Sequence, residues 1–275
     1  MPDASASPAV VLSVARSLVG VVCLLLVALA GTAVGAAVTA VTAVTAERVE
    51  HAGTRFRVVR ALPEQVGLVW KDAKGQPYRS FDKVQAALVP QGKTVAFIMN
   101  AGLFQMGGTP CGLHIENGQT LHAINLADGE GNFHLKPNGV LWIEAAGKDR
   151  RAFVAASEAF LTHQQKLAGD GGNGVQTAVQ SGPLLLIDGR RHPAFREGSA
   201  NKLHRNGVGV DAQGRIVFAI TEAGQSVNFW DFSGLFLQLG CRNALFLDGD
   251  LSEMAVNPGP AAASNQFGAM FVITQ

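Results

Sequence analysis

Residues 243–250 read Asn-Ala-Leu-Phe-Leu-Asp-Gly-Asp. Four apolar or strand-favouring residues run directly into an aspartate, which predicts a buried strand that ends at Asp248. Gly249 lets the backbone turn sharply or approach a ligand closely. A carboxylate at the edge of a core can have its pKa set by its surroundings for acid, base or nucleophile chemistry. The simpler interpretation is a strand end followed by an ordinary Asp-Gly turn.

Short strand patterns recur on both sides of this stretch. Polar turns at 116–118, 188–190 and 211–214 separate several of them and predict antiparallel hairpins. The expected strands are residues 54–60, 66–70, 93–99, 112–116, 120–125, 139–144, 183–188, 207–211, 215–221, 244–248 and 268–274.

Three segments have helical patterns. Residues 81–88 are short, and 157–167 begin with a potential N-cap serine, Ser157, and a glutamate in the first turn. Residues 226–239 carry phenylalanines and leucines along one face and lead through 240–242 into the strand that ends at Asp248. The Gly-rich stretch 168–174 predicts a loop. The sequence therefore predicts a single α+β domain of mostly antiparallel or mixed β-sheets with a few helices packed on them.

The N-terminal segment predicts export. Arg16 is followed by an uncharged run, 17–46, whose Val- and Leu-rich part resembles the apolar region of a signal peptide. The run ends Val44-Thr45-Ala46, which suits signal peptidase, but it is also long enough to span a bilayer uncleaved. We expect a signal peptide or membrane anchor at 1–46, a domain at 47–275, and a periplasmic or extracellular location. Any membrane contact would come only through the N-terminal segment.

Composition excludes several classes of function. A net charge of +1, with no basic run, gives no support for nucleic-acid binding. In the expected domain, Cys111 and Cys241 could pair in an oxidising compartment or remain buried thiols. Neither cysteine has zinc-site spacing, and the histidines at 114, 122 and 134 are expected to be structural. No metal or other cofactor is predicted, although Asp248 and Asp250 could in principle share a cation. The sequence makes no prediction of oligomeric state.

Three further places combine a strand end with glycine and polar residues. They are Asn100-Ala-Gly-Leu-Phe104, Gln180-Ser-Gly-Pro183 and Lys202-Leu-His-Arg-Asn-Gly207. Asn100 offers a donor and an acceptor, and the cations of the third segment suit an anionic group. Ser181 lacks the Gly-x-Ser-x-Gly pattern of a hydrolase nucleophile. Taken singly, each place could be an ordinary turn or a solvated loop.

Taken together and in order, these segments resemble the phosphodiester glycosidase family, which includes many exported bacterial proteins. Asp250 stands where many members have a second glycine, Leu251 precedes Ser252, and Ala101 replaces a glycine of the better-known enzymes. The resemblance rests on residues 100–104, 112–118, 132–140 and 180–185, on Arg205 with Gly209, and on Leu247-Asp-Gly249.

The resemblance implies hydrolysis of a sugar-1-phosphodiester. Asp248 is the candidate catalytic carboxylate, and Arg205 the candidate cation for the phosphate. The candidate substrate-binding residues are Asn100, Gly102, Ser181, Gly182, Lys202, His204, Thr221, Ser226, Gly249 and Asp250. The helix that starts at Ser226 would favour an anion at its N-terminus. The competing class is a non-catalytic envelope module that binds a glycan or phosphoglycan. A third possibility is an ordinary glycosidase, with Glu222 or Asp250 as the second acid.

Overall fold

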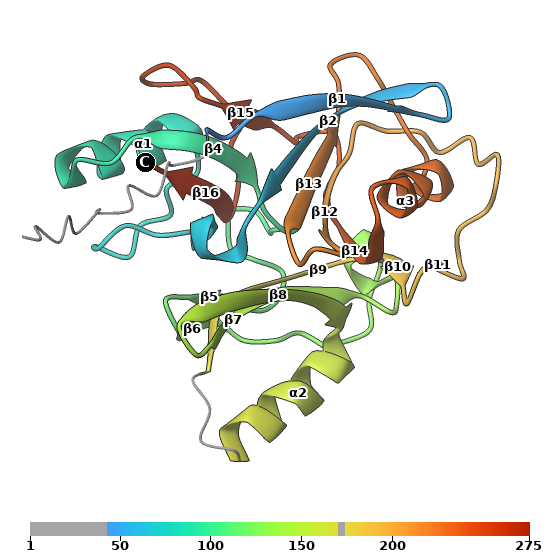
Figure 1. The fold of residues 1–275 in the computed structure, drawn as a ribbon, viewed down its shortest axis with the longest axis horizontal. Helices are drawn as coiled ribbons and strands as arrows, with labels where there is room; N and C mark the ends of the chain where they lie inside the picture. The colour runs from blue at the N-terminus through green and yellow to red at the C-terminus, as the bar shows by residue number, and fades with distance from the viewer. Residues whose placement is uncertain (1–42, 170–173) are drawn as a thin grey trace, which may run out of the picture. The chain divides into compact units, whose positions relative to one another are not determined.

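The computed structural model describes residues 43–169 and 174–275. Within these residues the strands form three sheets, and three α-helices pack against them (Figure 1). Every strand pair within the sheets is antiparallel. The predicted α+β class is therefore confirmed.

The largest sheet has seven strands and contains the strand that ends at Asp248. That strand is flanked by β12 and β10, and the register places Asn206 opposite Asp248, next to a bulge. The order is β1 (Ala46–His51), β2 (Thr54–Ala61), β13 (Ile216–Thr221), β12 (Asn206–Asp211), β14 (Cys241–Asp248), β10 (Leu184–Ile187) and β11 (Arg190–Arg191).

Two smaller sheets deliver the other candidate strand ends. Asn100 is the last residue of β4, in a four-stranded sheet, and Ser181 is the last residue of β9, in a five-stranded sheet. The four-stranded order is β15 (Met254–Val256), β4 (Val95–Asn100), β16 (Met270–Thr274) and β3 (Gly67–Val69). The five-stranded order is β6 (Gln119–His122), β5 (His114–Glu116), β9 (Val175–Ser181), β7 (Gly139–Ala146) and β8 (Asp149–Ala156).

The main core combines buried apolar side chains from all three sheets. Its aromatic centre is Phe218, whose ring centroid lies 4.8 Å from that of Phe97 and 5.1 Å from that of Phe271. Contacts of this kind dominate folding energetics because they remove large apolar areas from water. The core therefore holds the ends of β4 and β14 in one place.

Each helix buries an apolar stripe. Helix α1 (Phe81–Leu88) buries Phe81 and Val84 in a cluster with residues of β4 and β16. Helix α2 (Ser157–Gly169) packs Phe160 against Trp142 of the five-stranded sheet. Helix α3 (Phe229–Gln238) lies on the seven-stranded sheet and contacts β14 and β10 (Figure 1). The expected helices are confirmed in existence and approximate extent.

The start of α3 corrects one prediction. The helix begins at Phe229, and Asn228 caps it by accepting a 2.8 Å hydrogen bond from the Asp231 amide. Val227 cannot be helical because its backbone exchanges hydrogen bonds with Leu203 in an isolated bridge. Ser226 therefore lies outside the helix, exposed to solvent, and does not form its N-terminus.

Several strands were not expected. Strand β9 was missed because it carries Gln176, Thr177 and Gln180 and so lacks the apolar alternation of a typical strand. It is nevertheless mostly buried. The expected turns at 116–118, 188–190 and 211–214 are confirmed as hairpin connections, although Arg190 itself belongs to β11. The other unexpected strands are β1, β8, β11 and β15.

The expected domain boundary falls inside ordered structure. Residues 1–42 of the predicted signal or anchor lie outside the described residues, as do 170–173 of the predicted Gly-rich loop. Val44, however, belongs to the main core, and Ala46 pairs with Val59 at the start of β1. Among the helices that the structure describes, none is long and apolar enough to cross a membrane. Cys111 and Cys241 are free thiols.

Candidate active site

Asp248 is the last residue of β14 and is buried, with 7% of its surface exposed. Both carboxylate oxygens accept hydrogen bonds. Oδ2 accepts from Asn100 Nδ2 at 3.1 Å, and Oδ1 accepts from the Gly249 amide at 2.8 Å. These two bonds fix the orientation of the carboxylate. The sequence prediction that Asp248 ends a buried strand is confirmed.

Asn206 connects the end of β4, at Asn100, to the end of β14, at Asp248. Its Nδ2 donates to both the backbone and side-chain oxygens of Asn100, each at 3.0 Å, and its Oδ1 accepts from the Asp248 amide at 2.8 Å. Asn206 is fully buried, so each of these polar atoms needs its partner. The sequence analysis missed it, although it stands beside Arg205 at the start of β12.

The surroundings raise the pKa of Asp248 from 3.8 to about 6. Burial is the main cause because it disfavours the charged form. The hydrogen bonds from Gly249 and Asn100 oppose that effect, and the negative charge of Asp250 adds to it. A carboxyl with this pKa exchanges its proton near neutral pH, as a catalytic acid or base must.

A cleft of about 520 Å³ contains Asp248. One side comes from the hairpin at 104–110, which closes with a bridge between Phe104 and Pro110, and the other from the loops around Leu251 and Asn265. The lining combines aromatic and apolar surface with amide side chains and one arginine, as small-molecule binding sites commonly do. Its residues are Arg79, Leu103, Phe104, Gln105, Met106, Gly107, Asp248, Leu251, Asn265 and Gln266.

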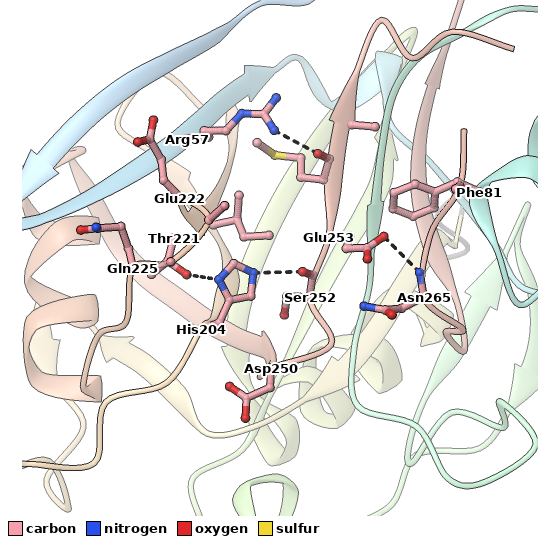
Figure 2. A pocket seen from close by; sticks show the side chains of 16 residues that line it. Arg57, Phe81, His204, Thr221, Glu222, Gln225, Asp250, Ser252, Glu253 and Asn265 are labelled. Atoms are coloured by element: carbon pink, nitrogen blue, oxygen red, sulfur yellow. Dashed lines mark hydrogen bonds between the residues drawn. The ribbon is translucent and has the colours of Figure 1, made fainter. Parts of the chain in front are cut away.

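A second cleft of about 540 Å³ shares Asn265 with the first. The side chains of His204, Thr221 and Asp250 line it together with Glu253 (Figure 2). The loop that follows Asp248 therefore contributes to both clefts, with Leu251 in the first and Asp250 in the second. Of the sequence-predicted residues, Asp248 thus lines the first cleft, and His204, Thr221 and Asp250 line the second.

His204 lies between Thr221 and the loop after Asp248 (Figure 2). Its Nε2 is 3.0 Å from the Ser252 carbonyl, which can only accept, so Nε2 carries a proton. Its Nδ1 is 2.6 Å from Thr221 Oγ1, and this oxygen accepts a hydrogen bond from the Arg205 amide. His204 thus connects β13 to the loop after Asp248.

Arg205 is 1% exposed and lies outside both clefts. Its Nε donates to the Val227 carbonyl at 2.9 Å, and its guanidinium carbon lies 3.9 Å from the centroid of the Phe229 ring. Nη2 contacts Asn201, while Nη1 is buried and has no hydrogen-bond partner among the described residues. Burial lowers its pKa to about 10, and the charge of Asp250 opposes that shift. Its phosphate-binding role stays a prediction.

Three of the candidate residues pack at a junction between sheets and line neither cleft. The buried Ser181 Oγ donates to the Leu247 carbonyl at 3.1 Å and accepts from the Leu103 amide. A Cβ on Gly102 would lie 2.7 Å from the Gln180 carbonyl oxygen, and one on Gly182 would lie 2.7 Å from Asn138 Cβ. These residues hold β9 against β14 and against the segment that leads into the Asp248 cleft.

The remaining candidate residues lie at the surface or in the turn that follows Asp248. Lys202 and Ser226 are exposed and line neither cleft. Gly249 contributes its amide to Asp248 Oδ1. Asp250 is exposed in the second cleft, whereas Asp248 is buried in the first. The roles of these residues stay predictions.

Gln180, quoted in the sequence analysis as part of a motif, is the centre of a buried network. Its Oε1 accepts from the amides of Leu113 and Asn125, and its Nε2 donates to the Asn125 carbonyl and to Ser157 Oγ. Ser157 in turn donates to Asn138. The segments 112–118, 132–140 and 180–185, on which the family resemblance rests, therefore meet in one hydrogen-bond network.

Together, the fold and the site define a class of protein: an antiparallel α+β domain with a buried aspartate in a cleft of mixed apolar and polar lining. The chain belongs to the phosphodiester glycosidase family, whose model matches residues 93–272. It is 35% identical over 202 residues to the uncharacterized protein YigE of Escherichia coli K12, covering 73% of each chain.

Solved structures share the fold. The catalytic domain of zebrafish N-acetylglucosamine-1-phosphodiester α-N-acetylglucosaminidase, auto-inhibited by its pro-peptide, superposes with a TM-score of 0.58 at 14% identity, covering 84% of this chain and 81% of that one. A putative exported protein of Burkholderia pseudomallei superposes with a TM-score of 0.51 at 12% identity, covering 80% and 74%. At these identities the likeness concerns the fold alone.

Proposed function

We propose that the protein is an exported hydrolase that cleaves a sugar-1-phosphodiester at the anomeric carbon, with Asp248 as the catalytic carboxylate. The observation that carries the proposal is the buried Asp248 in a cleft of mixed apolar and polar lining, with both oxygens hydrogen-bonded and its pKa raised to about 6. Membership of the family supports the reaction class. Export rests on the N-terminal sequence.

This reaction can proceed with a single catalytic carboxylate. The leaving group is a phosphate monoester, a stable anion, so it needs less help from a general acid than an ordinary glycoside does. The transition state instead places positive charge on the sugar ring, which a nearby carboxylate stabilises. Asp248 would act as nucleophile, as electrostatic stabiliser or as base for water, and Asn100 would hold it in position.

The test is a substrate panel with the purified full chain. We expect turnover of sugar-1-phosphodiesters and none of nitrophenyl glycosides of the same sugars. N-acetylglucosamine is the first sugar to test, because the zebrafish relative is an N-acetylglucosamine-1-phosphodiester α-N-acetylglucosaminidase. Asp248→Asn should abolish turnover, while Asp188→Asn, at an exposed hairpin turn, should leave it unchanged. Full turnover by Asp248→Asn would contradict the proposal.

The alternative is a non-catalytic module that binds glycans or phosphoglycans. The observation that favours it is Asp250, which brings a negative charge into the second cleft where many family members have glycine. Saturable binding of a sugar phosphodiester, with no hydrolysis over days, would support the module. Turnover that depends on Asp248 would exclude it.

A further inference from the structure

Arg79 is the arginine that lines the cleft of Asp248. It precedes α1 and has a left-handed backbone, with φ at +69°. Its carbonyl accepts a hydrogen bond from the Phe267 amide, which ties it to the segment that carries Asn265 and Gln266. Left-handed backbone is costly for a residue with a side chain and persists where the surrounding structure imposes it. The position of Arg79 is therefore determined by tertiary contacts.

The guanidinium of Arg79 spans the two sides of the cleft. On one side, Nη2 donates to Gln266 Oε1 at 3.1 Å. On the other side, the guanidinium carbon lies 5.9 Å from the centroid of the Phe104 ring. It also packs on Gly108, where an added Cβ would lie 2.6 Å from Nη1. Because Gly108 has no side chain, the guanidinium can lie against the hairpin.

The charge of Arg79 has no acidic partner. Among the described residues, no carboxylate lies within 4.0 Å of it, whereas Arg48, Arg55, Arg60 and Arg215 each pair with one. Its Nε is buried without a hydrogen-bond partner, and its one side-chain hydrogen bond goes to a neutral amide. A guanidinium carries five N–H donors, so the N–H groups of Nη1 and Nη2 that have no partner among the described residues remain for an anion.

We propose that Arg79 binds the phosphate of the substrate in the cleft of Asp248, an inference that rests on the proposed function. The observations are a cleft shared with Asp248, a guanidinium fixed between both sides, and a charge without an acidic partner. Arginine suits this role because its planar fork matches two phosphate oxygens. Arg205, the residue predicted from the sequence for this role, is buried beneath Phe229 and lies outside the cleft.

The reaction then has a defined course. The bond between the anomeric carbon and the phosphate oxygen breaks, and its electron pair stays on that oxygen, where the charge of Arg79 stabilises it. Water supplies the new oxygen on the anomeric carbon. One water proton passes through Asp248 or directly to solvent, and the products are the free sugar and a phosphate monoester. Binding the departing phosphate more tightly as its charge grows would raise kcat.

Binding of inorganic phosphate tests the site without turnover. Using the full chain, we would measure the phosphate Kd by calorimetry for the wild type, Arg79→Gln and Arg79→Lys. Arg190→Gln is the matched control, because Arg190 is exposed on β11 and lines no cleft described above. Arg79→Gln should weaken phosphate binding at least tenfold, Arg79→Lys should retain part of it, and the control should match the wild type. Thermal unfolding checks that each variant folds, and Arg79→Lys keeps the charge if Arg79→Gln does not fold.

The two hypotheses fail separately. If phosphate binds through Arg79 but no sugar phosphodiester is hydrolysed, the phosphate site stands and the proposed function is wrong. If the wild type fails to bind phosphate, or Arg79→Gln binds it with an unchanged Kd, the assignment of Arg79 is overturned whatever the turnover. Phosphate binding that survives Arg79→Gln but is lost in Arg205→Lys would return the role to Arg205.

Discussion

Asn100 Nδ2 donates a 3.1 Å hydrogen bond to Asp248 Oδ2, although 148 positions separate the two residues in the chain. The bond joins the last residue of β4 in one sheet to the last residue of β14 in another. Asn100 Oδ1 also accepts a hydrogen bond from the amide of Glu253, at the far end of the loop that follows Asp248. One buried asparagine thus orients the carboxylate and anchors the loop between the two clefts.

The raised pKa of Asp248 predicts a pH-dependent stability difference between wild type and Asp248→Asn. The folded protein binds the Asp248 proton more tightly than the unfolded chain, so the contribution of Asp248 to stability is greatest below pH 3.8 and is lost as pH rises through about 6. Relative to wild type, Asp248→Asn should gain about 2 kcal/mol in unfolding free energy between pH 4 and pH 7.5. Denaturant unfolding at both pH values checks this, and a constant difference would contradict it.

Asn206→Ala should disrupt the site and the fold together. It leaves the Asp248 amide and the Asn100 oxygens short of buried partners, so we expect a loss of about 2–4 kcal/mol in stability. Turnover at a temperature where the variant is folded should fall at least tenfold, mainly in kcat, because the carboxylate loses its orientation. Asn243→Ala is the control, since among the described residues the Asn243 side chain bonds only the amide of the exposed Asp188. Equal effects of the two variants would argue against the positioning role.

Asp250→Gly should move the acid limb of the pH profile of kcat/KM to lower pH. The negative charge of Asp250 raises the pKa of Asp248, so removing it lowers that pKa and keeps the carboxylate ionised in more acidic solution. Asp250→Asn removes the charge without adding glycine and should give the same direction of shift. A shift in the glycine variant alone would point to backbone freedom as the cause.

Val44→Ala should destabilise the domain although Val44 lies inside the predicted signal segment. Val44 is 7% exposed in the main core, and its carbonyl accepts a hydrogen bond from Asn257. We expect a loss of about 1–2 kcal/mol, with Thr45→Ala, at an exposed neighbour, close to neutral. Cleavage after Ala46 would remove this residue, and mass spectrometry of the protein purified from its native host should find Val44 retained. A mature chain starting at Glu47 would contradict this.

Much of the fold could be predicted because its signals are local. Apolar runs identified β4 and β14, and the expected turns at 116–118, 188–190 and 211–214 supplied antiparallel connections. The apolar face of α3 could also be predicted, from the spacing of its phenylalanines and leucines. Strand β9 was missed because its polar side chains are buried through hydrogen bonds to distant segments, which no periodic pattern records.

By itself, the sequence determined that Asp248 ends a buried strand, since apolar residues followed by Asp-Gly specify that locally. Only the tertiary structure decided which residues surround it. Asn206 reaches Asp248 through sheet pairing, and Arg79 reaches its cleft through contacts with Gln266 and Gly108. Arg205 had the chemistry of a phosphate ligand in sequence, but packing placed it under Phe229. Side-chain type is written in the chain, whereas proximity and burial arise when distant segments share one core.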